Sequence, residues 1–215
     1  GYFTLAGVEV ITAATKEEEH FHLTCEAMEK VIKPSTKAIL INSPSNPTGA
    51  VLSLDELKAI AQFAKERDLI VISDEPYESI VYDGRKNYSI AALPDMFART
   101  ITVNSFSKTF AMTGWRVGYA VAEEAFINAM TIMQESLTSS VNAASQYAAC
   151  VALTSPKDEV EEMRRVYEKR AELLERGLNR IKGFSFIKPE GAFYAFVNIK
   201  DTGMTSEEVS QRLIE

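Results

Sequence analysis

Residues 100–119 read TITVNSFSKTFAMTGWRVGY, and they carry more information about the fold and the chemistry than any other stretch. The segment begins as a short apolar strand. It then passes through a turn that places Lys108 among small hydroxyl residues, and it reaches Arg116 just before a second apolar run. In an open α/β sheet, ligands bind beyond the carboxyl ends of the strands. The stretch therefore predicts a strand that delivers an amine, hydroxyl groups and a guanidinium to one ligand site.

Buried strands alternate with helices in the first half of the chain. Apolar runs at 38–41 (AILI) and 69–72 (LIVI) are typical of buried strands. Between them, Ser53 and Glu56 form a capping box that predicts a helix to about Arg67. Alternation with short connections predicts an α/β domain whose sheet is mostly parallel, with flanking helices. Further strands are expected at 8–12, 100–103 and 117–121.

The second half of the chain is dominated by helical patterns. A long helix is predicted from Pro156 to about Lys182, because proline suits the first turn of a helix and acidic residues follow it. Thr205 and Glu208 predict the cap of a last helix. Other expected elements are helices at 25–31, 122–135 and 141–153 and strands at 184–187 and 192–199. We therefore expect a large domain over residues 1–155 and the start of a smaller α+β domain over residues 156–215.

The composition excludes several functional classes. Of the 215 residues, 46% are hydrophobic, which is enough to bury a sizeable core. A net charge of −7 argues against a nucleic-acid or anionic-membrane partner, and no apolar run is long enough to span a bilayer. Cys25 and Cys150 are expected to be buried free thiols, which fits a reducing compartment such as the cytoplasm. Because the chain starts without methionine and ends in mid-helix, we expect it to be a piece of a longer protein.

Polar residues follow three of the predicted strands at the point where each strand ends. Asn46 follows the strand at 38–41, Asp74 follows the next strand, and Lys108 follows the strand that opens the quoted segment. The carboxyl ends of parallel strands meet at one edge of a sheet. We therefore expect these three residues to converge on a single crevice although they are far apart in sequence.

The residue types in the quoted segment fit a phosphate-bearing aldehyde cofactor. Lys108 would form a Schiff base with the aldehyde, although a single lysine is by itself usually a solvated surface residue. Ser105, Ser107 and Arg116 would bind the phosphate, because a guanidinium fork can hold two oxygens of a dianion. Pyridoxal 5'-phosphate is the cofactor that needs this set of groups.

Asp74, Tyr77 and Asn46 would complete such a cofactor site. Asp74 would face the pyridine nitrogen and keep it protonated, so that the ring can accept the electrons of a carbanion. The phenol of Tyr77 and the amide of Asn46 would bind the 3-oxygen of the ring. The alternatives are a loop acid for Asp74, an amphipathic edge tyrosine for Tyr77 and an ordinary turn asparagine for Asn46.

The phosphate ligands also have alternatives. Arg116 can instead pair with a carboxylate such as Glu123 or Glu124. The hydroxyls of Thr109 and Thr113 can take the place of either serine. The assignment of the hydroxyl ligands is therefore left open between these serines and threonines.

Two charged features are not expected to carry function. His20 and His22 lie two residues apart in an acidic stretch, but no further ligand is nearby, so we expect solvated loop residues and no metal site. The run at 164–180 mixes both signs of charge at helical spacing and is typical of a solvated helix face.

Taken together, these motifs resemble the fold-type-I pyridoxal-phosphate enzymes, and among them the class I/II aminotransferases of the aspartate-aminotransferase type. The matching segments occur in the family's order and cover nearly the whole chain. They are SPSNPTG at 43–49, SDEPYE at 73–78, SFSKTFAMTGWRVGY at 105–119 and PEGAFY at 189–194.

The resemblance implies catalytic roles for Lys108, Asp74 and Tyr77. Lys108 would carry the Schiff base, Asp74 would pair with the ring nitrogen, and Tyr77 would contact the 3-oxygen. The cofactor ligands that it implies are Asn46, Asp74, Tyr77, Ser105, Ser107, Lys108 and Arg116.

The activity that the resemblance implies is transfer of an amino group from an amino acid to a 2-oxo acid, in a parent that is a homodimer. A pyridoxal-phosphate C–S lyase or an aminocyclopropane-carboxylate synthase would share every residue named above. The sensor domain of a transcription regulator is an alternative from another class. The family's stacking aromatic residue, phosphate loop and substrate-carboxylate arginine have no match here, and Arg212 lies too early for the last role. We therefore expect little or no activity from these residues alone.

Overall fold

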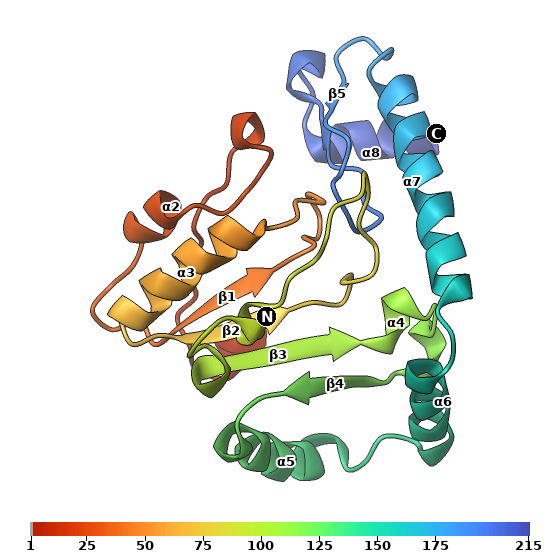
Figure 1. Ribbon diagram of the computed structural model, residues 1–215. Coiled ribbons are helices and arrows are strands. Elements are labelled where there is room, and N and C mark those ends of the chain that lie inside the picture. The colour runs from red at the N-terminus through yellow and green to blue at the C-terminus, as the bar shows by residue number, and fades with distance from the viewer. Residues whose placement is uncertain (1) are drawn as a thin grey trace.

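A four-stranded sheet lies at the centre of the computed structural model, which describes residues 2–215 (Figure 1). Strands β1 (Ala38–Asn42), β2 (Ile70–Asp74) and β3 (Thr100–Ser105) run parallel to one another. Strand β4 (Gly118–Val121) pairs with β3 in the antiparallel direction at the edge of the sheet. The order β1-β2-β3-β4 confirms the prediction of an α/β fold with a mostly parallel sheet.

Helix α3 (Leu54–Glu66) covers one face of the sheet and forms the main core with it. Its predicted capping box is present, because the Ser53 amide donates to the Glu56 carboxylate at 2.7 Å and the Glu56 amide donates back to Ser53 Oγ. Along β1, Ile41 faces this core and is 2% exposed, whereas Leu40 points to the opposite face and is 49% exposed. The buried residues of α3 are Leu57, Ile60, Ala61, Phe63 and Ala64.

Helices α5 (Glu124–Thr138) and α6 (Ala143–Thr154) follow β4 and lie at one end of the molecule (Figure 1). They expose much apolar surface, because α5 has no buried residue and α6 buries only Ser145 and Ala149. Cys150 lies on α6 and is exposed, so the prediction that it is buried is wrong. Cys25 is half-buried, and the two cysteines form no disulfide. No helix within residues 2–215 is both long enough and apolar enough to cross a membrane.

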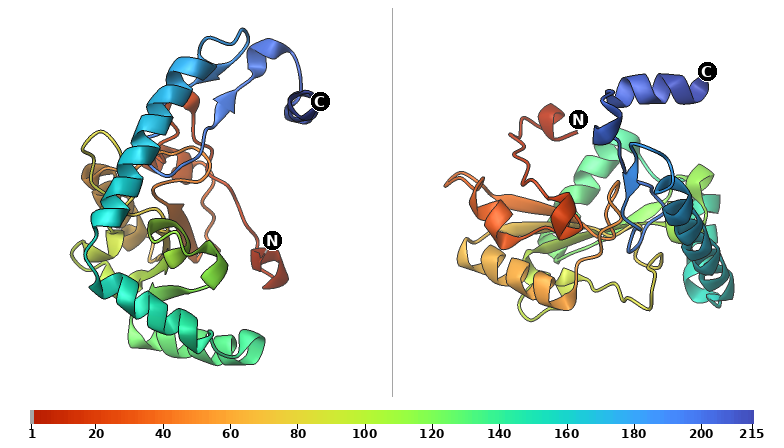
Figure 2. Two further views of the ribbon diagram at one scale, coloured as in Figure 1. Left: turned by 90° about the vertical axis from the view of Figure 1, so that its right-hand side faces the viewer. Right: turned by 90° about the horizontal axis from the view of Figure 1, so that it is seen from above.

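The long helix α7 (Asp158–Leu178) connects this end of the molecule to a two-stranded sheet and a last helix at the other end (Figure 2). Strands β5 (Ser185–Phe186) and β6 (Val197–Asn198) are antiparallel, and α8 (Ser206–Ile214) starts at the predicted capping box of Thr205 and Glu208. The remaining short elements are α1 (Tyr2–Leu5), α2 (Cys25–Glu29), α4 (Phe106–Thr109), η1 (Glu17–Glu19), η2 (Ile90–Ala92), η3 (Phe97–Arg99), η4 (Thr113–Trp115) and η5 (Lys200–Thr202).

Several predicted boundaries are wrong. The segment at 8–12 is not a strand, because it pairs with no other strand among residues 2–215 and its valines are exposed. Helix α7 begins at Asp158 rather than at Pro156 and ends before Lys182. Of the predicted strand at 192–199, only the last part joins a sheet. For the two predicted strands the local pattern is compatible with a strand, but within residues 2–215 no neighbouring strand pairs with 8–12 or with the first part of 192–199.

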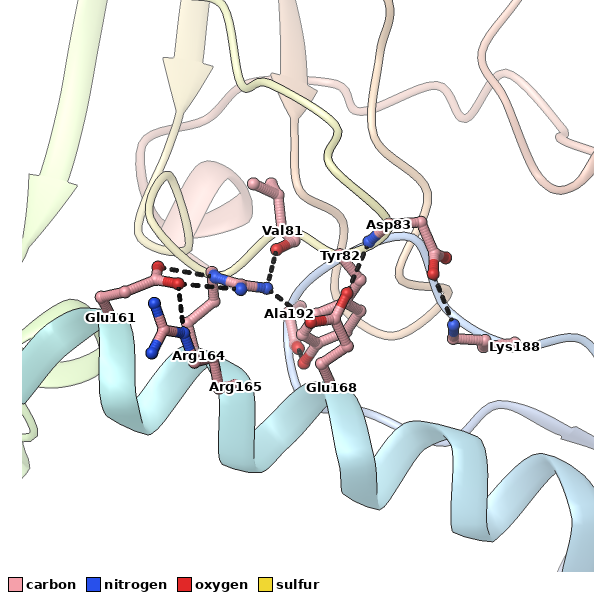
Figure 3. A network of polar contacts seen from close by, with 9 residues as sticks. All are labelled: Val81, Tyr82, Asp83, Glu161, Arg164, Arg165, Glu168, Lys188 and Ala192. Atoms are coloured by element: carbon pink, nitrogen blue, oxygen red, sulfur yellow. Dashed lines mark hydrogen bonds and ion pairs between the residues drawn. The ribbon is translucent and has the colours of Figure 1, made fainter.

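The charged residues of α7 are not only a solvated face, because two of them dock the helix on the loop after β2 (Figure 3). Arg164 is ion-paired with Glu161 and Glu168 and donates from Nη1 to the carbonyl oxygen of Val81 at 3.1 Å. Glu168 accepts a hydrogen bond from the Asp83 amide at 2.7 Å. The prediction of an ordinary solvated face is therefore wrong for Arg164 and Glu168.

His22 is not a solvated loop residue either. Its side chain is largely buried between two carboxylates, with Nδ1 donating to Glu56 at 2.6 Å and Nε2 donating to Glu190 at 2.8 Å. The hydrogen bond to Glu190, joined by that to Glu56, raises the pKa of His22 to about 9 against the opposing effect of burial. A charged imidazole therefore joins the N-terminal segment, α3 and the segment before β6.

We expect His22→Gln to destabilise the fold in a pH-dependent manner. Because the folded-state pKa of about 9 exceeds the ordinary value of 6.5, the extra stability is fully present below pH 6.5 and is lost as the pH rises towards 9. The free energy of unfolding in urea should drop by about 1–2 kcal/mol at low pH, and the difference from wild type should shrink above about pH 9.5. His20→Gln, at an exposed position, is the matched control. Equal effects of the two substitutions at about pH 6 would contradict this assignment.

Candidate active site

The carboxyl ends of β1, β2 and β3 meet at one edge of the sheet. Asn42, the last residue of β1, lies opposite Asp74, the last residue of β2, and Asp74 lies opposite Val103 of β3. Helix α4 begins directly after β3 and carries Lys108 in its last turn. The structure therefore places the ends of three strands, and the loops that follow them, at the same edge, as the sequence predicts.

Asp74 lies half-buried at this edge. It accepts a hydrogen bond on Oδ2 from Asn42 Nδ2 at 3.1 Å, and burial raises the pKa of its carboxyl group. No lysine or arginine within residues 2–215 forms an ion pair with it. Asp74 is therefore a desolvated carboxylate that can accept a hydrogen bond from a cationic ligand group.

Tyr77 is buried within a cluster of aromatic residues that come from the segment before β6. Its hydroxyl is hydrogen-bonded to the hydroxyl of Tyr194, and its ring packs edge-on against Phe193 at a centroid distance of 5.4 Å. Burial and the Tyr194 hydroxyl raise the pKa of Tyr77, whereas a hydrogen bond from the Asn46 side chain acts in the opposite direction. The predicted residues Tyr77 and Asn46 are thus neighbours in the structure.

Lys108 reaches the same aromatic cluster from α4. Its Nζ atom lies 5.3 Å from the centroid of the Phe193 ring and 5.9 Å from the centroid of the Tyr77 ring. The amine therefore lies beside the loop that begins with Asp74. The structure thus places the amine beside the Tyr77 ring, on the loop that follows the strand end carrying Asp74.

The predicted phosphate ligands are only partly assembled. Ser105 Oγ accepts a hydrogen bond from the amide of Ser107 at 3.1 Å, and Ser107 is buried. Arg116 is exposed and has a left-handed backbone with φ of 51°, and its guanidinium donates to the carbonyl oxygen of Thr113 at 2.9 Å. Within residues 2–215 it makes no ion pair with Glu123 or Glu124. The guanidinium is thus close in sequence to the two serines but bound to its own turn.

Thr109 is held by a half-buried acid rather than left free for a ligand. Its hydroxyl donates to Glu78 Oε1 at 2.9 Å, while Glu78 Oε2 is buried and has no hydrogen-bond partner within residues 2–215. Burial raises the pKa of Glu78, against the effect of the Thr109 hydrogen bond. This contact joins the residue after Lys108 to the residue after Tyr77 and so fixes the two loops against each other.

Three residues at this site were not found from the sequence: Asn42, Glu78 and Tyr194. The signals were present but weak. Asn42 is the last residue of its strand, as Asp74 is of the next one, and Glu78 and Tyr194 each end a quoted motif. Within residues 2–215, no group of three or more His, Cys, Asp or Glu side chains is arranged to hold a metal ion.

Comparison with known proteins identifies the family of this fold and site. A family model described as aminotransferase class I and II matches residues 1–215. The chain is 49% identical over 213 residues to aromatic-amino-acid aminotransferase 2 of Thermococcus litoralis. The aligned region covers 98% of this chain and 54% of that protein. It is also 49% identical over 212 residues to the aspartate aminotransferase of Pyrococcus abyssi, with the same coverage. The chain spans about half the length of these curated relatives.

Solved structures agree with these relatives. The crystal structure of an aromatic aminotransferase from Pyrococcus horikoshii superimposes with a TM-score of 0.94 at 46% identity, covering 98% of this chain and 57% of that one. The aspartate aminotransferase of Thermus thermophilus with maleate superimposes with a TM-score of 0.92 at 36% identity, covering 98% and 55% of the two chains. Fold and sequence therefore point to the same family.

We expect Thr109→Val to destabilise the chain, because it leaves the buried carboxyl group of Glu78 without its hydroxyl donor. The free energy of unfolding in urea should fall by about 1–2 kcal/mol. Thr113→Val is the matched control, since Thr113 is exposed and its side chain should change the stability by less than about 0.5 kcal/mol. If the two variants unfold at the same urea concentration, the Thr109–Glu78 contact does not hold the two loops together.

Proposed function

The chain belongs to the aminotransferase class I and II family, and we propose that the whole protein transfers an amino group from an amino acid to a 2-oxo acid. One observation carries this proposal. The structure places the Lys108 amine beside the aromatic cluster of Tyr77 and Phe193, at the sheet edge where Asp74 ends β2. An amine, a phenol and a carboxylate that meet in this way are the groups that amino-group chemistry on a bound aldehyde cofactor needs.

Enzymes of this family depend on pyridoxal phosphate, and the donor set of the site fits that cofactor. A half-buried carboxylate without a cationic partner within residues 2–215 suits a protonated ring nitrogen, and this is Asp74. Tyr77 and Asn46 would bind the 3-oxygen. Lys108 would hold the aldehyde carbon covalently through Nζ.

The phosphate group of the cofactor would be bound by Ser105, Ser107 and Arg116. Ser107 is buried at the start of α4, and its amide donates to Ser105 Oγ at 3.1 Å, so the two serines are neighbours at the start of the helix that carries Lys108. Arg116 would have to release the carbonyl oxygen of Thr113 to reach a phosphate. Its exposure leaves it free to do so.

When bound, the cofactor supplies an electron sink for the α-carbon of the amino acid. Asp74 would hold a proton on the ring nitrogen, which would maintain that sink. The Lys108 amine would be the base that removes the proton from the α-carbon of the substrate. Phe193 lies beside the Lys108 amine, and Tyr194 packs against the ring of Tyr77.

The relatives favour transfer over the other reactions that this site can support. A C–S lyase or an aminocyclopropane-carboxylate synthase would use the same residues. The relatives from Thermococcus litoralis and Pyrococcus abyssi, however, are named as an aromatic-amino-acid and an aspartate aminotransferase. We therefore propose an aromatic or acidic amino acid as the amino donor. The transcription-regulator alternative has no support among these relatives.

We propose three further properties of the protein. Residues 1–155 form the large cofactor-binding domain, and residues 156–215 form the linking helix and the start of the small domain. The whole protein is a cytoplasmic homodimer, and the apolar surface of α5 and α6 is available for such a contact. The 215 residues alone have little or no activity, because the family's stacking aromatic residue, phosphate loop and substrate-carboxylate arginine have no match among them.

Pyridoxal phosphate should label Lys108 alone. An absorption titration of the 215-residue chain is expected to show a new near-UV/visible band, corresponding to about one imine per chain. Borohydride reduction and peptide mapping should then find the adduct on Lys108. Lys108→Ala should abolish both signals, whereas Lys86→Ala, at an exposed lysine, should leave them unchanged. Labelling spread over many lysines, or retained in Lys108→Ala, would count against the site.

The whole protein should exchange amino groups without releasing ammonia. Incubated with an aromatic or acidic amino acid and a 2-oxo acid, it is expected to form one molecule of each product per turnover. Lys108→Ala should lower kcat by at least about a hundredfold, because it removes the base that moves the α-proton. Stoichiometric ammonia and pyruvate would instead identify a lyase.

A further inference from the structure

We propose that Asn42 is the positioning residue of this site, whose side-chain amide holds the Asp74 carboxylate and the Asn46 loop in a fixed relation. The inference rests on the proposed function, because Asp74 and Asn46 are assigned there to the ring nitrogen and the 3-oxygen of the cofactor. Asn42 would touch neither. It would act through these two residues.

The geometry begins with the register of the sheet. Asn42 and Asp74 are opposite each other at the ends of β1 and β2. Asn42 Nδ2 donates to the carbonyl oxygen of Asp74 at 3.0 Å and to Asp74 Oδ2 at 3.1 Å. Asn42 Oδ1 accepts a hydrogen bond from the backbone amide of Asn46 at 2.7 Å. The side-chain amide of Asn42 therefore donates to Asp74 through Nδ2 and accepts from the Asn46 amide through Oδ1.

The orientation of this amide is fixed by its two backbone partners. The amide N–H of Asn46 can only donate, so it must face Oδ1, and the carbonyl oxygen of Asp74 can only accept, so it must face Nδ2. Both requirements agree. The NH₂ group of Asn42 is therefore directed at the carboxylate of Asp74, and the reverse orientation would place two acceptors against each other.

No other group takes over this role among the described residues. Glu75, the next acid along the chain, accepts hydrogen bonds from Ser73 and Ser89 at 2.7 and 2.8 Å and so is engaged elsewhere. The Tyr77 hydroxyl is bound to Tyr194. Within residues 2–215, Asn42 is thus the side chain that donates to the Asp74 carboxylate, and it occupies Oδ2 while leaving Oδ1 for a ligand.

The experiment compares the carboxyl titration of Asp74 in the cofactor-free 215-residue chain and its variants. Carbon-13 NMR of labelled aspartate follows each carboxyl group, and the Asp74 signal is identified by its loss in Asp74→Asn. Asn42→Ala should raise the Asp74 pKa by about one unit, because the charged form loses a hydrogen-bond donor. Asn42→Asp keeps the shape and the acceptor for Asn46 but faces Asp74 with a second carboxylate. It should raise the upper step of a coupled titration by more than one unit.

Asn179→Ala is the matched control. The Asn179 side chain also binds both backbone groups of one residue, accepting from the Phe186 amide at 2.7 Å and donating to the Phe186 carbonyl oxygen at 3.0 Å. It forms no hydrogen bond with a carboxylate of the described residues. It should lower the melting temperature without moving the Asp74 titration. An Asp74 pKa that is unchanged in both Asn42 variants, with folding retained by circular dichroism, would overturn the proposal and leave Asn42 a merely structural residue.

The outcome is separable from that of the proposed function. If the wild-type chain fails to bind pyridoxal phosphate although Asn42→Ala and Asn42→Asp shift the Asp74 titration, the cofactor assignment fails and the Asn42–Asp74 coupling stands. If wild type binds the cofactor and neither variant shifts the titration, the positioning role fails alone. If both the proposed function and the positioning role of Asn42 hold, Asn42→Asp should weaken cofactor binding at least about tenfold, and Asn179→Ala should leave it unchanged.

Discussion

The in-register pairing of three parallel strands is the constraint on which the rest of the site depends. Side chains alternate between the two faces of a strand, so a slip of one residue would move every buried side chain to the other face. The burial of Ile41 on β1 and Val71 on β2 against α3 fixes the register through the core. In this register the last residues of β1 and β2, Asn42 and Asp74, lie opposite each other. The apolar packing against α3 therefore determines which polar side chains meet at the carboxyl ends of the strands.

A second constraint brings the segment before β6 back onto this edge. The amides of Glu190 and Gly191 donate to the carbonyl oxygen of Gly49, and the Ala192 amide donates to Ile80. A Cβ atom at Gly191 would lie 2.7 Å from the Ile80 carbonyl oxygen, so glycine permits this approach. The aromatic residues that follow are therefore carried to Tyr77 and Lys108, and a segment distant in sequence completes the site.

The sequence was informative where a signal is local and failed where a contact is long-range. The capping box at Ser53 and the apolar run at 69–72 depend on neighbours within a few residues, and both are present in the structure. The convergence of Asp74 and Lys108 followed from the rule for parallel strand ends. The partners of His22, 34 and 168 residues away, could not be read from an acidic stretch that is typical of a solvated loop. For the same reason the sequence did not distinguish Asn42 from an ordinary turn residue.

Three partly or fully buried acids lie at the end of β2 and in the loop after it, and they differ in whether they hold the structure together or are free to bind a ligand. Burial raises the pKa of Asp74, Glu75 and Glu78 alike. Glu75 is bound by two serine hydroxyls and Glu78 by the Thr109 hydroxyl, so both are committed to holding loops together. Asp74 receives only a neutral amide on one oxygen among the described residues. A permanent lysine or arginine partner would neutralise that carboxylate and compete with a ligand, whereas an amide orients it and leaves its charge available. Because the Asn42 amide is neutral, the half-buried Asp74 carboxylate keeps its charge and can bind a cationic ligand group reversibly.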